Sequence, residues 1–137
     1  MHLSLALSLP AEERLVPAAR KAIAELLVAA EVPPDALADV VLALDEACSN
    51  VLKHAFPRQA PGSYELRADV RPGEVVVDVI DHGVGFDPME WRPAEVIDLT
   101  GRGFEIMRRL MTSVEVESPA ERGGTRIRLR KRLPAGA

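Results

Sequence analysis

The chain has little cysteine, no long apolar run and no excess of basic residues. It has one cysteine, Cys48, among 137 residues, which excludes an internal disulfide and a cysteine-rich metal site. Its apolar runs are too short to span a bilayer, and no signal-peptide pattern opens it. Acidic residues outnumber basic ones, 21 against 17, which does not suit a general nucleic-acid-binding surface. We therefore expect a cytoplasmic protein without direct nucleic-acid or membrane partners.

Asparagine is as scarce as cysteine. Asn50 is the only one, and it lies in a stretch typical of a helix, ALDEACSNVLKHAF. Asparagine is a poor helix-interior residue because its side chain competes for backbone hydrogen bonds. At about 100° per residue, Glu46, Asn50 and His54 form one stripe at the edge of an apolar arc that faces the core. The arc consists of Val40, Leu44, Ala47, Cys48, Val51, Leu52 and Ala55. An ordinary helix-edge contact and a ligand site both fit this stripe.

Hydrophobic patterning divides the chain into strands and helices within a single domain, 1–137. Alternating residues predict five strands: 2–9, 63–70, 74–80, 113–118 and 124–133. Helical spacing predicts three helices: 10–30, about 35–56 with Asp35 as N-cap, and 104–111. Strands joined by short turns must be antiparallel. We therefore predict an α+β fold, a two-layer sandwich in which helices cover one face of a mostly antiparallel mixed sheet.

Three glycine motifs follow the helix that contains Asn50. DHGVGF comes directly after an apolar strand, so Asp81 stands at a strand end, and Gly83 and Gly85 allow a tight backbone path there. TGRGFEIM places Gly101 and Gly103 at the start of a helix, where free N–H groups and a partial positive charge suit phosphate. GGTRIRL leads into the last strand. Each motif alone also fits a plain turn or cap.

In this order, the motifs resemble the ATP-binding fold shared by DNA gyrase, the heat-shock chaperone ATPase, MutL and histidine kinases, known as the Bergerat or GHKL fold. The resemblance covers residues 2–132. The stretches DEACSNVLKHAF, DHGVGFDP, GRGFEIMRRLM and GGTRIRL look most like the stand-alone anti-sigma factor serine/threonine-protein kinases. These bacterial regulators bind a sigma factor and phosphorylate a serine of an anti-anti-sigma (STAS) protein. The resemblance thus implies both partners, ATP and Mg²⁺, and a homodimer through the N-terminal strand and first helix.

The resemblance also implies a role for each matching residue. Asn50 would coordinate Mg²⁺ bridging the ATP phosphates, and Glu46 would be the general base for the attacking serine hydroxyl or water. Asp81 would accept the adenine amine, helped by Thr125 through a water. Residues of about 86–100 would form the lid over the nucleotide. The remaining contacts would be Gly83 and Gly85 in the adenine pocket, and Gly101, Arg102 and Gly103 at the phosphates.

Three functions are compatible with these residues. The first is a protein serine kinase that acts as an anti-sigma factor. The second is an ATP-binding switch without kinase activity that docks a regulator or phosphatase, because the ligands for binding and for transfer largely coincide. The third, the ATPase half of a sensor histidine kinase, fits poorly, because only one strand and one helix precede the helix of Asn50. Function has to be argued from the site rather than from the fold.

For several other side chains we expect a structural rather than a functional role. We expect Cys48 and Trp91 to pack in the interior, His54 to lie at a helix edge and His82 to be exposed. We expect the four alternating arginines to form a solvated sheet face: Arg126, Arg128, Arg130 and Arg132. For the arginines, a docking face for an acidic partner is the alternative. Glu105 departs from the apolar residue usual in the family and would repel a triphosphate if it pointed inward. Thr112 and Ser113 replace an acidic pair common in the family.

Overall fold

The structure, a computed structural model, describes residues 2–54, 62–81, 102–117 and 124–134. Its elements, in chain order, are β1 (Leu3–Pro10), η1 (Glu13–Leu15), α1 (Val16–Ala29), α2 (Pro34–His54), β2 (Ser63–Arg71), β3 (Glu74–Asp81), α4 (Arg102–Leu110), β4 (Ser113–Glu117) and β5 (Thr125–Arg132). The predicted order of strands and helices is confirmed. None of the helices in these ranges is long and apolar enough to cross a membrane.

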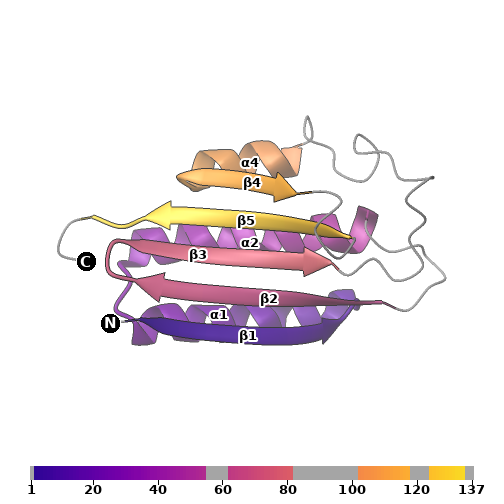
Figure 1. Ribbon diagram of the computed structural model, residues 1–137, viewed down its shortest axis with the longest axis horizontal. Coiled ribbons are helices and arrows are strands. Elements are labelled where there is room, and N and C mark those ends of the chain that lie inside the picture. Colours follow the sequence, from indigo (N-terminus) through magenta and orange to yellow (C-terminus); the bar gives the residue numbers. More distant parts are fainter. Residues whose placement is uncertain (1, 55–61, 82–101, 118–123, 135–137) are drawn as a thin grey trace.

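The five strands form one sheet in the order β1-β2-β3-β5-β4 (Figure 1). The last strand of the sequence therefore lies between β3 and β4. All four pairings are antiparallel, so the described strands contain no parallel pair, although the prediction allowed a mixed sheet. β2 and β3 form a hairpin whose turn contains Gly73 at a φ of 90°, a conformation that favours glycine.

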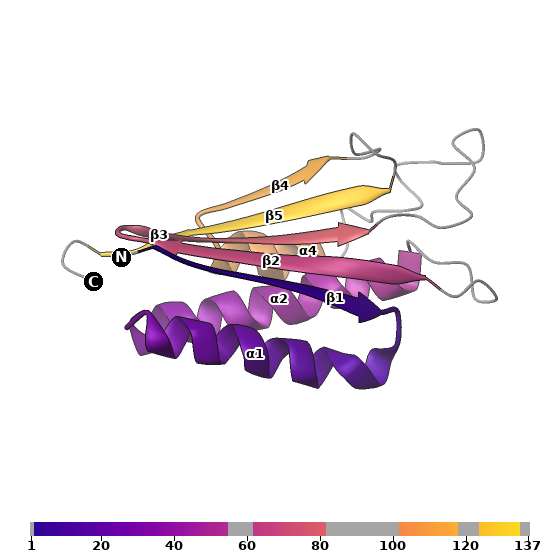
Figure 2. The same ribbon diagram turned by 60° about the horizontal axis from the view of Figure 1, so that its bottom comes forward.

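The described helices α1, α2 and α4 cover the same face of the sheet, as Figure 2 shows. Between the two layers lies one apolar core, which the inward residues of the strands share with α1, α2 and α4. Its largest fully buried side chains include Tyr64, Phe104, Ile23, Leu27, Leu44 and Leu66. Burying an aliphatic or phenylalanine side chain of this size contributes about 1.5–3 kcal/mol. The α+β two-layer fold is therefore confirmed, and its other sheet face is left for polar residues.

The turn between α1 and α2 ends one helix and starts the next. Glu31 has a φ of 60°, and the amides of Glu31 and Val32 donate to the carbonyls of Val28 and Leu27. This is the Schellman arrangement of a helix C-terminus, with buried Val32 packed in the core beside Leu27. α2 then begins at Pro34, so the prediction that Asp35 is the N-cap is wrong. Asp35 instead lies in the first turn, where its carboxylate suits the helix dipole.

Candidate functional site

The edge of α2 carries the first part of the candidate site. The predicted apolar arc is confirmed for Val40, Leu44, Ala47, Cys48 and Val51, which are buried. Glu46 and Asn50 are half-buried at its border. The Nδ2 atom of Asn50 is buried and has no hydrogen-bond partner in the part of the chain that the structure describes. Leaving a buried amide donor unpaired costs roughly 1–3 kcal/mol, which a ligand oxygen at this position would recover.

The first turn of α4 packs against this edge. A Cβ atom added to Gly103 would lie 3.1 Å from Oε2 of Glu46. A side chain at position 103 would therefore press on the Glu46 carboxylate, so the glycine keeps room for it. The backbone N–H groups at the start of a helix have no partner within the helix and carry a partial positive charge. Glu46 thus stands next to a helix start that is suited to bind an anion.

Two further site residues meet at one end of the sheet. Asp81 ends β3, Thr125 begins β5, and the two are direct cross-strand partners. Both are almost completely buried, with 2% and 3% of their surface exposed. Figure 1 shows this end of the sheet on the same side of the molecule as the last turns of α2 and the start of α4. The strand ends that carry Asp81 and Thr125 therefore lie toward the same end of the molecule as the last turns of α2 and the first turn of α4 (Figure 1).

Part of the predicted site lies outside the described residues. This applies to Gly83, Gly85 and Gly101, and to the predicted lid at about 86–100, with His82 and Trp91. Arg102 belongs to the first turn of α4 and His54 to the last turn of α2, but the side chains of both are beyond what the structure describes. Their roles stay predictions.

Known proteins are similar to this chain in sequence. The model of the histidine kinase-like ATPase domain matches residues 9–131. The Anti-sigma F factor of Caldanaerobacter subterraneus is 32% identical over 111 residues, which cover 75% of this chain and 76% of the relative. The chain belongs to the anti-sigma kinase family of histidine kinase-like ATPase domains. The resemblance seen in the sequence is confirmed.

Other members of this anti-sigma kinase family match over similar lengths. The Anti-sigma F factor of Clostridium botulinum (strain Eklund 17B) is 29% identical over 121 residues, 84% of each chain. The serine-protein kinase RsbW of Listeria innocua is 28% identical over 126 residues, 85% of this chain and 80% of the relative. A solved structure with the RsbU and RsbW domains of a Mycobacterium tuberculosis protein superposes with a TM-score of 0.72 over 97% of this chain, at 23% identity. The present chain spans 34% of that longer one, and the likeness shows the shared fold.

Beneath the site, this family member has a buried thiol and phenol that sequence reasoning did not connect. Tyr64 is the cross-strand partner of Asp81 on β2 and is fully buried. Its hydroxyl lies near the thiol of Cys48 without a well-formed hydrogen bond to any described residue. Burial raises the pKa of Cys48 to about 12 and also raises that of Tyr64. The thiol therefore stays protonated and serves as packing, as predicted, and strand alternation could have placed Tyr64 on the core side of β2 but not beside Cys48.

The carboxylate of Glu105 points away from the phosphate end of the site. Its side chain is 59% exposed and accepts a hydrogen bond of 2.8 Å from Nη2 of Arg109, one turn along α4. The outward orientation of the Glu105 carboxylate therefore avoids the repulsion of a triphosphate that an inward orientation would cause. Thr112 has a structural role, because its hydroxyl accepts a hydrogen bond of 2.8 Å from the amide of Arg132.

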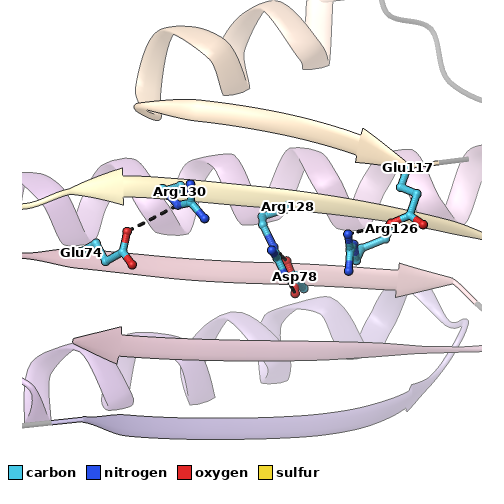
Figure 3. Close-up of polar contacts among 6 residues, drawn as sticks. All are labelled: Glu74, Asp78, Glu117, Arg126, Arg128 and Arg130. Carbon is cyan, nitrogen blue, oxygen red and sulfur yellow. Dashed lines mark hydrogen bonds and ion pairs between the residues drawn. The ribbon is translucent and has the colours of Figure 1, made fainter. Parts of the chain in front are cut away.

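The arginines of β5 alternate on the open face of the sheet, as predicted, and three of them pair with acids of the same face (Figure 3). The pairs are Arg128 with Asp78 at 2.8 Å, Arg126 with Glu117 at 2.6 Å and Arg130 with Glu74 at 3.4 Å. Arg128 binds Asp78 through two parallel hydrogen bonds, which raise the pKa of its guanidinium. These charges are largely neutralised within the sheet, which supports a solvated face over a docking site for an acidic partner.

On a different side of α2, Asp45 takes part in an ion pair that the sequence analysis did not predict. Its Oδ2 accepts a hydrogen bond of 2.8 Å from Nη1 of Arg20 on α1. The pair lies at a cavity of about 470 Å³ that Val16 and Lys53 also line. The signal was available in the helical wheel, where Asp45 lies about 100° from Glu46 and therefore faces a different neighbour.

Proposed function

We propose that this chain is an ATP-dependent protein serine kinase that acts as an anti-sigma factor. It would bind a sigma factor and transfer the γ-phosphate of ATP to a serine of an anti-anti-sigma (STAS) protein. Membership of the anti-sigma kinase family supports the proposal, as do relatives named Anti-sigma F factor and serine-protein kinase RsbW. A homodimer through β1 and α1 is part of the same proposal by family resemblance.

One observation carries the proposal. The buried Nδ2 atom of Asn50 has no partner among the described residues, and it belongs to the same helix edge as Glu46. Gly103 of α4 faces that edge at close range. A polar edge that packing leaves incompletely hydrogen-bonded, facing the start of a helix, is suited to polyphosphate rather than to structural hydrogen bonding.

The same edge fits a magnesium ion held jointly with phosphates. Mg²⁺ is usually bound through one or two side chains together with waters and substrate phosphates. The described residues contain no group of three histidine, cysteine, aspartate or glutamate side chains that could hold a metal alone. Asn50, through its amide oxygen, would be the protein's ligand. The bound ion would neutralise charge on the phosphates.

The adenine would lie at the end of β3 and β5. Asp81 is buried, so its carboxylate is shielded from water and would accept a hydrogen bond from the exocyclic amine of adenine. Thr125, directly across the strand pair, would hold the water that completes this contact. These two residues would select the base, whereas the α2 edge and α4 would bind the phosphates.

Phosphoryl transfer would need a base at the phosphate end. The serine hydroxyl oxygen attacks the γ-phosphorus, an O–P bond forms, and the bond from that phosphorus to the oxygen that leaves with ADP breaks. Glu46 accepts the hydroxyl proton. Its position beside Gly103 is half-buried, so part of the Glu46 side chain stays exposed.

The substitution Glu46→Gln tests this function. We expect phosphate transfer to a serine-bearing STAS partner to fall by about 10²–10⁴-fold, because a positioned general base contributes that much, while ATP still binds. Glu105→Gln is the control, because that acid faces solvent, and it should transfer normally. Radiolabelled ATP measures both rates. Undiminished transfer by Glu46→Gln would rule out the general base.

Partner binding is tested by pull-down of the sigma factor with and without ATP–Mg²⁺. Binding of the sigma factor in either condition supports the anti-sigma role. Nucleotide-dependent binding by a chain that transfers no phosphate to any partner would instead identify the non-kinase switch.

A further inference from the structure

Lys131 is a charged residue on the core side of the sheet. On β5, Thr125, Ile127 and Leu129 point inward and are buried, and Lys131 is the next residue with that orientation. Its side chain is 21% exposed. A lysine so far from solvent is unusual unless its ammonium group is paired, and its long stem packs along apolar surface.

The ammonium group of Lys131 joins two helices. It donates a hydrogen bond of 2.9 Å to Oδ2 of Asp39 on α2 and one of 2.5 Å to the carbonyl oxygen of Leu110. Leu110 is the last residue of α4, so this carbonyl is one of those that a helix leaves without an internal partner. A cation at this place also suits the negative end of the helix dipole.

The chain leaving α4 is fastened to the same part of β5. The amide of Thr112 donates to the carbonyl of Arg130 at 2.8 Å, and the amide of Arg132 donates to the Thr112 hydroxyl at 2.8 Å. The C-terminal end of α4 is therefore attached to β5 by these two bonds and by Lys131, whose ammonium group also bonds Asp39 of α2 and so adds a polar link to the apolar packing of the two helices.

The other end of α4 is the phosphate end of the proposed site. α4 has 9 residues, which corresponds to about 13 Å of helix. A helix this short moves as a rigid body, so a shift of its C-terminus displaces Gly103 relative to Glu46. We propose that Lys131 is a positioning residue for nucleotide binding, which holds α4 against α2 so that its first turn meets the phosphates. The inference rests on the proposed function, since it assigns the phosphates to that turn.

A positioning role differs measurably from a purely stabilising one. If Lys131 only stabilises the fold, its loss lowers the melting temperature but leaves ligand preference unchanged in the folded protein. If it positions α4, its loss weakens ligands that carry phosphates and spares adenosine, because Asp81 and Thr125 hold the base on β3 and β5. The ratio of the dissociation constants for ATP–Mg²⁺ and adenosine therefore separates the two roles.

The test compares Lys131→Met with Arg132→Met, which removes an exposed cation from the next position of the same strand. At a temperature where circular dichroism shows both variants folded, titration should give a Kd for ATP–Mg²⁺ raised about tenfold in Lys131→Met, a size typical of residues that affect a binding site without touching the ligand. The Kd for adenosine should be unchanged. Arg132→Met should match the unmodified chain, and Lys131→Arg, which keeps a donor cation, should recover most of the affinity. If Lys131→Met does not fold, Asp39→Asn weakens the same contact and should raise the same ratio.

An unchanged ratio in a folded Lys131→Met variant would overturn the positioning role, whatever its melting temperature. Equal weakening of ATP–Mg²⁺ and adenosine would also overturn it, because the effect would not be specific to the phosphates. If the unmodified chain bound adenosine and ATP–Mg²⁺ alike, or neither, the proposed function would fail together with this inference. Failure of the proposed function can be distinguished from failure of the positioning role, because it appears in the unmodified chain before any substitution is made.

Discussion

The open face of the sheet and the edge of α2 both carry polar side chains in partly buried positions, but these groups are paired to different extents. On the open face, Arg128 and Asp78 satisfy each other through two hydrogen bonds. On the edge of α2, Asn50 keeps a buried nitrogen that no described residue accepts from. The Nε atom of Arg130 on the open face also lacks a hydrogen bond, but it has an acid, Glu74, 3.4 Å away, whereas Nδ2 of Asn50 has no partner among the described residues.

Two adjacent residues of α2 show the same contrast at closer range. Asp45 is paired with Arg20 on α1, whereas Glu46 points to the other side and lies against Gly103 of α4. One acid thus joins two helices, and its neighbour faces the start of a helix suited to anions. Asp45 and Glu46 carry the same functional group, but their different neighbours indicate different roles.

The strongest test of the open face is removal of one partner of its most buried ion pair. Asp78→Ala leaves the guanidinium of Arg128 partly buried and unpaired, since the Asp78 and Arg128 side chains are 13% and 31% exposed. We expect the free energy of unfolding to fall by about 2 kcal/mol, as for hydrogen bonds to charged groups. Urea denaturation measures this loss. Glu115→Ala, at an exposed position beside Arg128 on β4, should change stability by less than about 0.5 kcal/mol. Equal losses of unfolding free energy in the two variants would show that the Arg128–Asp78 pair contributes no more to the fold than an exposed acid of the same face.

A second test uses pH to probe the groups buried beneath the site. Burial raises the pKa of the Cys48 thiol from 9.0 to about 12, so above pH 9 the unfolded chain loses a proton that the folded chain keeps. Stability should therefore decrease as pH rises across this window, by up to about 1.4 kcal/mol per pH unit for the thiol. Tyr64, whose pKa is also raised, adds to the loss at the alkaline end.

Cys48→Ala is the matched variant for this pH dependence. It should remove the slope between pH 9 and the onset of tyrosine ionisation, while the later part persists. Denaturant unfolding at a series of pH values measures both. An identical slope in Cys48→Ala would show that the thiol is not the group responsible.

The smallest expected effect on stability is at Asn50. Asn50→Ala should leave the fold intact and increase its stability by about 0.5 kcal/mol, because alanine favours a helix interior and the unpaired amide is removed. Thermal unfolding measures this gain. A clear loss of stability would show that the Asn50 amide contributes to the fold after all.

Much of the architecture could be predicted because alternation and helical spacing are local signals. The strands at Leu3–Pro10 and Glu74–Asp81 and the long helix at Pro34–His54 follow from them within one or two residues. The sheet order was not predictable in this way, because β5 pairs with β3 across a long stretch of sequence. Register decides which acid faces each arginine, so the partner of Arg128 could only come from the structure.

For the candidate site, too, local patterns could be predicted from the sequence and tertiary contacts could not. Helical geometry predicted that Glu46 and Asn50 share one edge of the core, and strand patterns predicted that Asp81 ends a strand. The cross-strand pairing of Asp81 with Thr125 and the closeness of Gly103 to Glu46 depend on tertiary packing. Strand alternation places Lys131 on the same side of β5 as Ile127 and Leu129, but its partners, Asp39 and the carbonyl of Leu110, could only come from the structure.

The central claim is that Nδ2 of Asn50, which has no partner among the described residues, is left for a phosphate oxygen, while the amide oxygen of Asn50 binds the magnesium ion of the nucleotide complex. Titration of ATP–Mg²⁺ into the unmodified chain and into Asn50→Ala, by calorimetry at equal folded fractions, tests it most directly. We predict saturable binding to the unmodified chain and no detectable binding to the variant, although the variant is at least as stable. Normal binding of ATP–Mg²⁺ by Asn50→Ala would contradict the account.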